Sequence, residues 1–165
     1  MRIIKLGIIS IIVFSLLITG ISLFFPSHVR ISKAIDITAS KDSLMSQIGD
    51  AANWKKWYPG ADTSDYLIIA GKIKGIVTEN KQALRIKEIN DSAVLAMNVG
   101  PNSKGGESGW NIFPGRIPNS LTVQWYMDFH LRWYPWEKFS SLLLEKRYGT
   151  MMEQGLSRLK ALLEK

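Results

Sequence analysis

The sequence has few residues of the types that carry out chemistry in proteins. It contains no cysteine, which excludes disulfides, thiolate metal sites and a cysteine nucleophile together. Its two histidines, His28 and His130, are too few for a multi-histidine metal centre. His130 falls on the polar positions of an expected strand, so we expect it to be exposed rather than catalytic. The sequence therefore predicts neither a metal site nor a cofactor.

Carboxylates and glycines give no stronger signal. Glu88, Glu107 and Asp128 could act as acid or base only if buried beside a ligand. Asp128 falls on the polar face of its expected strand, which argues against such burial. Gly105-Gly106 lacks the Lys-Ser/Thr pair of a phosphate loop, and no G-x-S-x-G elbow is present. We predict no catalytic residue. Three other polar side chains could orient the head of a bound ligand: Arg85, Asn98 and Asn111.

One apolar run dominates the first part of the chain. Residues 6–25 contain no charge and no polar face, and about 20 such residues cross a hydrocarbon core of about 30 Å. A buried core helix would need a polar stripe. A cleaved signal peptide is the closer alternative, since Arg2 and Lys5 supply its positive start. Its apolar region usually has only about 7–15 residues, however, and no small-x-small pair follows directly. We predict an uncleaved single-pass anchor over residues 1–26.

Positive charge is dispersed along the sequence. The net charge is +7, but there is no basic run and no aromatic RNA-binding motif, so nucleic acid is not an expected partner. The charge suits solubility or anionic lipid headgroups. Arg2 and Lys5 lie closer to the apolar run than the Lys and Arg residues after it. This arrangement favours an internal amino end and a domain on the extracytoplasmic side.

The remainder, residues 27–165, is predicted to be one domain held at the bilayer surface. Only Pro26-Ser27-His28 separates it from the apolar run, and three residues reach about 10 Å. Residues 29–37 alternate apolar side chains, interrupted by Lys33, and predict a strand.

Two short helices are expected next, and then a sheet. Ser40 is a plausible N-cap for a helix over 41–50, and a short helix or turn follows over 51–60. Turn residues then separate short runs that predict antiparallel strands at 66–71, 72–78, 83–89, 93–99 and 108–113. A hairpin turn is expected at Asn90-Asp91-Ser92 and a loop at 101–106.

The longest alternation runs over 121–133. Its odd-numbered side chains are all apolar and its even-numbered ones almost all polar, which indicates a strand covered on one face.

The C-terminal part is predicted to be helical with one interruption. Pro135 ends the sheet, and two apolar stripes follow, the first with Phe139, Leu142 and Leu143. The second stripe runs from Tyr148 to Leu163 and points in nearly the opposite direction, so one straight helix cannot bury both. We predict a break near 147–149, followed by a long amphipathic helix that covers the sheet.

Two segments resemble the START-like, or SRPBCC, superfamily, particularly its polyketide cyclase/dehydrase and lipid-transport branch. "VRISKAIDITASKDSLMSQIGDAANWKKWYP" is similar to its opening strand, helix pair and W-x-x-W-x-P turn. "LEKRYGTMMEQGLSRLKALLE" is similar to its closing helix. The resemblance covers residues 29–164 and departs at Ala39-Ser40, where many relatives have a proline. It implies an α+β helix-grip fold, with about seven curved antiparallel strands around a long C-terminal helix. Here one transmembrane helix would precede that fold.

The resemblance also implies a largely apolar cavity between the sheet and the last helix, which holds lipids, sterols, polyketides or plant hormones in various members. The superfamily has no universal catalytic residue. Positions facing such a cavity give the predicted ligand-binding residues, although each could equally be ordinary core: Trp110, Trp125, Met127, Phe129, Met152, Gly155 and Leu156.

Three functions follow from this interpretation. The leading one is a membrane-tethered, non-enzymatic module that binds a lipid-like or polyketide-like molecule. The second is a polyketide cyclase/dehydrase-type enzyme, which would need a buried group with a shifted pKa in the cavity. The third is an interaction or stress-response domain whose cavity is filled by side chains.

Overall fold

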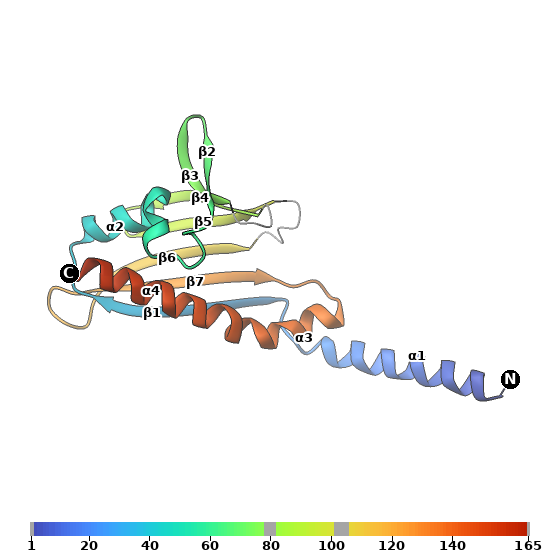
Figure 1. Cartoon of the computed structure of the whole chain (residues 1–165). Helices are drawn as coiled ribbons and strands as arrows, with labels where there is room; N and C mark the ends of the chain where they lie inside the picture. Colours follow the sequence, from blue (N-terminus) through green and yellow to red (C-terminus); the bar gives the residue numbers. More distant parts are fainter. Residues whose placement is uncertain (1, 78–81, 101–105, 165) are drawn as a thin grey trace.

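A seven-stranded antiparallel sheet forms the frame of the domain, in the order β1-β7-β6-β5-β4-β3-β2. The first strand therefore pairs with the last (Figure 1). The computed structural model describes residues 2–77, 82–100 and 106–164. The strands are β1 (His28–Ile37), β2 (Asp65–Ile69), β3 (Lys72–Val77), β4 (Ala83–Asn90), β5 (Ala93–Val99), β6 (Glu107–Pro114) and β7 (Leu121–His130). The predicted turn after Asn90 is confirmed, whereas most of the loop predicted at 101–106 lies outside the described residues.

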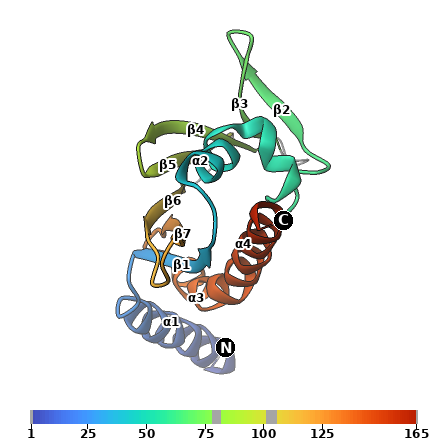
Figure 2. The same cartoon turned by 90° about the vertical axis from the view of Figure 1, so that its left-hand side faces the viewer.

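The sheet curves around helices that cover one of its faces (Figure 2). The covering elements are α2 (Lys41–Gly49), the 3-10 helix η1 (Ala51–Lys56) and α4 (Thr150–Leu163). Register shifts in the β2–β3 and β4–β5 pairs add an irregular residue, which bends and twists strands. Ser40 caps α2 as predicted, because its Oγ accepts a hydrogen bond from the Ser43 N–H. This arrangement is the predicted α+β helix-grip fold.

The C-terminal helix is interrupted where the sequence predicted a break. α3 (Pro135–Leu144) passes through one π-helical turn, η2 (Glu145–Gly149), into α4. The π turn shifts the phase of the side chains, so α4 buries its own stripe against the sheet. The apolar stripe predicted for α3, however, is mostly not buried. Leu142 and Leu143 are exposed, and α3 buries Glu137 and Lys138 instead.

The last strand is shorter than the alternation in the sequence indicated. β7 ends at His130, and Leu131 N then donates to the Ser27 carbonyl (2.7 Å). Trp133 was expected on the covered face, and that prediction is wrong, since 63% of its surface is exposed. The reason is local. Pro135 occupies the first position of α3, a position that proline favours. The chain must therefore leave the sheet before Pro135.

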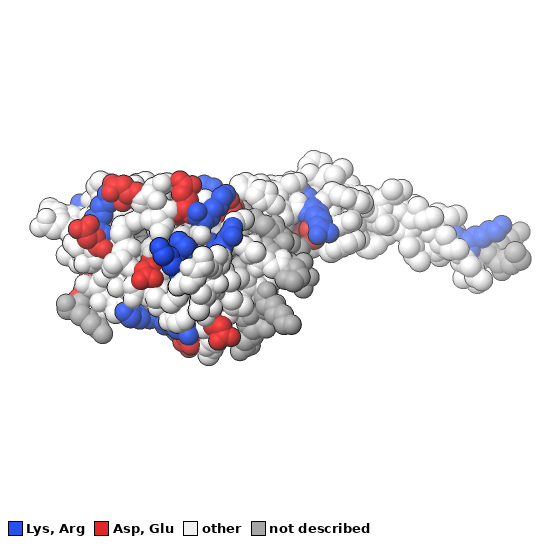
Figure 3. Space-filling model, turned by 90° about the horizontal axis from the view of Figure 1, so that it is seen from above, with Lys and Arg blue, Asp and Glu red and all other residues white. Residues whose placement is uncertain are grey.

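Helix α1 (Arg2–Ser22) projects from the domain as an apolar rod (Figures 1 and 3). Its segment Ile3–Ser22 is long and apolar enough to cross a membrane, and none of its most apolar window is buried in the protein. The buried-core interpretation therefore fails. A helix of this kind can be a membrane anchor or a signal sequence. Figure 3 shows charges of both signs scattered over the domain.

Candidate functional site

Four tryptophans fill the centre of the space between sheet and helices. Trp54, Trp57, Trp110 and Trp125, here called the aromatic cluster, are all fully buried. Their neighbouring rings lie 5.4–6.0 Å apart in tilted or edge contacts, which aromatic pairs favour. Large rigid rings at this density leave no room for a ligand, so this part of the interior is core.

Hydrogen bonds hold three of these four indoles in place. Trp125 Nε1 donates to Ser108 Oγ (2.9 Å), and Trp54 Nε1 donates to the Ile48 carbonyl (2.7 Å). Trp57 Nε1 donates to the Gln47 carbonyl (3.1 Å). The fourth, Trp110 Nε1, is buried and has no hydrogen-bond partner among the described residues. The cluster is therefore fixed by polar as well as apolar contacts.

Helix α4 approaches the cluster at a glycine. A Cβ on Gly155 would lie 2.7 Å from Trp125 Cζ3 and 2.9 Å from Pro59 Cδ, which is closer than real contacts allow. Met152 and Leu156 are buried on the same side of α4. Five of the seven predicted ligand-binding residues thus lie in packed core: Trp110, Trp125, Met152, Gly155 and Leu156.

A cavity of ≈ 140 Å³ lies beside the cluster. It is at the end of the sheet that α1 joins, here called the α1 end, where Val29 pairs with Phe129 just after α1 and the short linker. The described residues that line it are Tyr58, Gln82, Asn98, Glu107, Met127, Asp128, Phe129, Tyr148 and Met151. Tyr58 also touches all four indoles of the cluster, so it separates the packed region from the cavity.

The structure brings two of the predicted residues, Met127 and Phe129, to this cavity. That any of the seven binds a ligand stays a prediction. Sequence reasoning did not select Tyr58, Tyr148 or Met151 as ligand-binding residues. Tyr58 lies inside the W-x-x-W-x-P segment, and Tyr148 begins the second apolar stripe. The sequence therefore contained a pattern that could have pointed to each of these two tyrosines. Among the three polar candidates, Asn98 lines the cavity, whereas Arg85 and Asn111 do not.

The charged groups near the cavity are committed to ion pairs. Arg30 holds Asp128 with two hydrogen bonds, from Nε to Oδ1 (2.7 Å) and from a terminal nitrogen to Oδ2 (2.6 Å). These bonds keep the pKa of Asp128 below its usual range, although burial opposes them. Glu107 accepts from Lys87 Nζ at 3.0 Å. Asp128 is buried, as an acid would have to be, but its charge is stabilised, which does not suit a general acid.

The phenols give the cavity a different character. Desolvation raises the pKa of Tyr58 well above its ordinary value, so its hydroxyl stays protonated and can donate to a ligand oxygen. The Phe129 and Tyr148 rings lie 4.8 Å apart across the wall formed by β7 and η2. Within residues 2–77, 82–100 and 106–164, no group of three or more metal-ligating side chains is present. The lining thus combines aromatic and thioether side chains with four polar or charged ones, which are Gln82, Asn98, Glu107 and Asp128.

The curved sheet, the long C-terminal helix and the space between them define a helix-grip domain. The family model for polyketide cyclase / dehydrase and lipid transport matches residues 28–164, and the chain belongs to this family. Among curated protein sequences, none matches the chain at a significant level.

Solved structures confirm the fold at low sequence identity. A START superfamily protein from Mycobacterium smegmatis is 17% identical with a TM-score of 0.60, covering 82% of this chain and 97% of its own. The Aha1 dimer from Colwellia psychrerythraea is 20% identical with a TM-score of 0.55, covering 82% and 96%. The di-domain ARO/CYC StfQ from the steffimycin biosynthetic pathway is 9% identical with a TM-score of 0.60, covering 83% and 51%. At such identities the likeness concerns the fold alone.

Proposed function

We propose that this protein is a membrane-tethered, non-enzymatic START-like domain that takes the apolar part of a small molecule or lipid into the cavity at the α1 end. The observation that carries the proposal is the cavity's position and lining. Tyr58, Met127, Phe129, Tyr148 and Met151 supply its aromatic and thioether walls. The domain, residues 27–165, begins directly after the segment 1–26 that we assign as the anchor, so a ligand drawn from the bilayer has a short path.

The cavity volume limits what can bind. By size alone, a void of about 150 Å³ accommodates a molecule as large as benzene. The ≈ 140 Å³ here suits one ring or the end of an acyl chain rather than a whole lipid. Tyr148 belongs to the π-helical turn η2, and π turns interrupt the regular helical ladder, often at functional sites. Movement of that turn is the simplest way for the cavity to accept more of the ligand.

Catalysis has less support than binding. A cyclase or dehydrase needs a group that gives or takes a proton beside the substrate. Asp128 is bound by Arg30, and Tyr58 holds its proton too firmly to act as a base near neutral pH. The proposal is therefore that polar residues in the lining orient a ligand. The extracytoplasmic side remains our assignment for the domain, from the charges flanking α1.

A second function has one observation in its favour. The aromatic cluster fills the centre of the interior, as expected of a domain that interacts with partners through its surface rather than through a cavity. The two functions differ in what co-purifies with the protein.

The test compares ligand content in three full-length proteins purified in the same detergent. Met151→Trp puts an indole at the cavity wall, while Met45→Trp makes the same change in α2, at the end of the domain away from α1 (Figure 1). Lipids that coat α1 are common to all three, so only the difference reports on the cavity. Mass spectrometry of solvent extracts should show one compound reduced about tenfold in Met151→Trp and unchanged in Met45→Trp. Equal extracts from all three proteins would favour the interaction domain.

The tether has its own test. Membranes carrying the full chain are washed at alkaline pH, which strips peripheral proteins. The chain should stay in the membrane pellet at its full length, whereas a shortened soluble product would identify residues 1–26 as a cleaved signal.

A further inference from the structure

Helix α3 has its polar and apolar faces the wrong way round for a helix packed on a soluble domain. It buries Glu137 (8% exposed) and Lys138 (4%), while Trp136, Leu142 and Leu143 are about two-thirds exposed. Helices on water-soluble proteins normally bury the apolar stripe and expose the charges. Such an inversion indicates that the surroundings of α3 are not water.

The buried charges explain how α3 is held. Lys138 Nζ donates to the Phe25 carbonyl (2.9 Å) and to Ser27 Oγ (2.6 Å), at the carbonyl end of α1, where a cation is favoured. The Phe25 and Phe139 rings meet edge-on at 5.2 Å. Glu137 Oε2 accepts from Arg132 N (2.9 Å), just after β7. Together these contacts attach α3 to the end of the apolar rod.

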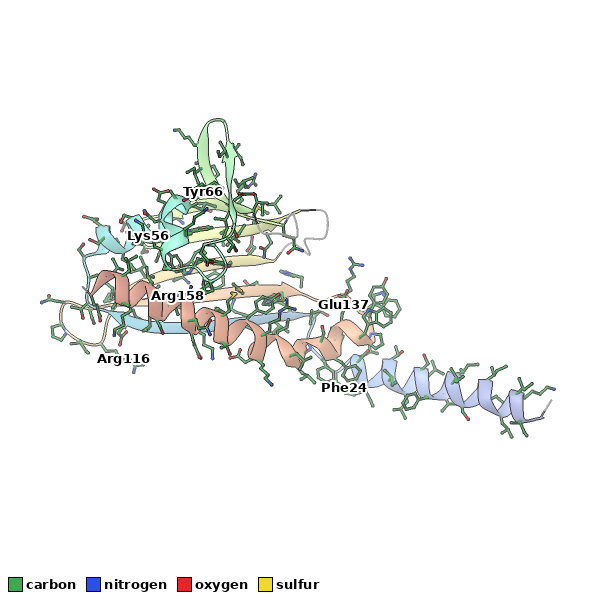
Figure 4. The ribbon with its side chains drawn as sticks, in the orientation of Figure 1. Phe24, Lys56, Tyr66, Arg116, Glu137 and Arg158 are labelled. Carbon is green, nitrogen blue, oxygen red and sulfur yellow. The ribbon has the colours of Figure 1, made fainter. Side chains whose placement is uncertain are left out.

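The exposed apolar side chains continue the surface of that rod. Trp133 (63% exposed) and Phe24 (90%) lie at the same junction as α3, and Figure 4 shows Phe24 and Glu137 there. Pro135 and Trp136 line an open groove against the stretch of α1 from Ser10 to Thr19. The Trp133, Tyr134 and Trp136 rings follow one another at centroid distances of 4.8 Å. The apolar surface of α1 thus passes without a break onto α3.

Lipid fits this surface better than a protein partner does. Tryptophan and tyrosine concentrate at the boundary between hydrocarbon and headgroups, and amphipathic helices lie in that plane. Exposed basic residues stand at both ends of α3, Arg132 before it and Lys146 and Arg147 after it, where they can meet anionic headgroups.

We infer that α3 is an interfacial membrane helix. Trp133, Trp136, Leu142 and Leu143, here called the interfacial face, enter the headgroup and acyl boundary beside α1. This inference rests on the proposed membrane tether. The two contacts with the bilayer fix the orientation of the domain and hold the α1 end of the sheet, with its cavity, against the membrane.

The experiment uses the full chain in phosphatidylcholine/phosphatidylglycerol vesicles. Because the sequence has no cysteine, single cysteines accept spin labels without background. Labels go at Leu142→Cys and Leu143→Cys. Phe14→Cys in the middle of α1 is the lipid reference, and Arg116→Cys is the aqueous reference at the other end of the domain (Figure 4). All four positions are exposed, so the labels do not disturb the core.

Relaxation by oxygen, which enters lipid, is compared with relaxation by a water-soluble nickel chelate. Labels at 142 and 143 should have an oxygen-to-nickel ratio about tenfold above that of the label at 116. Their ratio should thus approach the high ratio expected of the label at 14, which lies in lipid. A ratio equal to that at 116, with 14 still lipid-exposed, overturns the interfacial helix and leaves the tether standing. Immobile labels shielded from both reagents would mean a protein partner and also overturn it. Nickel access at 14 would overturn the tether itself.

Discussion

The interior has two regions that differ in how they are built. Around the aromatic cluster, α4 approaches the sheet through Gly155 until its backbone meets Trp125, and nothing the size of a methyl group can be added. At the α1 end the same helix begins with a π turn, and a cavity remains between Tyr148, Met151 and β7. The first region is packed core, and the second, next to the apolar rod, keeps a space in which we propose that a ligand binds.

Truncating one aromatic side chain in each region gives the sharpest contrast. Trp125→Ala should lower the free energy of unfolding by about 3–5 kcal/mol, because it empties a filled site and leaves Ser108 Oγ without its donor. Phe129→Ala should cost about 1–2 kcal/mol, because Phe129 is half-buried and already borders a cavity. Denaturant unfolding of the purified chain measures both. Equal costs would mean that the two regions are packed alike.

Adding one methyl group to each region of the C-terminal helix is the converse test. Gly155→Ala should destabilise the protein by about 1–3 kcal/mol, because the new Cβ meets the Trp125 and Pro59 rings. At Gly149 the atoms nearest to a new Cβ are Glu145 Oε1 (3.0 Å) and Lys33 Cε (3.1 Å), which belong to the far ends of flexible side chains. Gly149→Ala should therefore be neutral or stabilising, by at most about 1 kcal/mol from helix propensity. Thermal unfolding distinguishes the pair, and a reversed order would contradict the packing described here.

The α1 end has an electrostatic support that the aromatic cluster lacks. Arg30→Ala leaves the buried Asp128 carboxylate without its main partner and should cost about 1–2 kcal/mol at neutral pH. The pKa of Asp128 is lower in the folded protein than the value of about 3.9 expected when unfolded. The stabilisation is therefore complete above pH of about 4 and disappears as the pH falls through the folded pKa. Unfolding curves from neutral pH down to acid should show wild type and variant converge; a gap independent of pH would assign the loss to packing.

Most of the fold could be predicted from the sequence, because apolar side chains recur at different periods in strands and in helices. The strands here also have only one covered face, which makes their alternation visible. The break before α4 followed from two stripes that no single helix can bury. The exposure of Leu142 and Leu143 could not be predicted the same way, because a hydrophobic stripe has the same pattern whether it faces a core or a bilayer. The cavity was harder still, since inward-facing Trp125 and Phe129 look alike in the sequence. Only packing decides that one fills the core and the other borders a space.

Photocrosslinking tests the central claim most directly, that the ligand occupies the cavity at the α1 end. The full chain in vesicles is exposed to a fatty acid with a diazirine at the end of its acyl chain, and crosslinked peptides are identified by mass spectrometry. The account predicts adducts on peptides that contain Phe129 and on those that contain Tyr148 and Met151, and their loss in Met151→Trp. Adducts confined to α1 and the interfacial face, and unchanged in that variant, would contradict it.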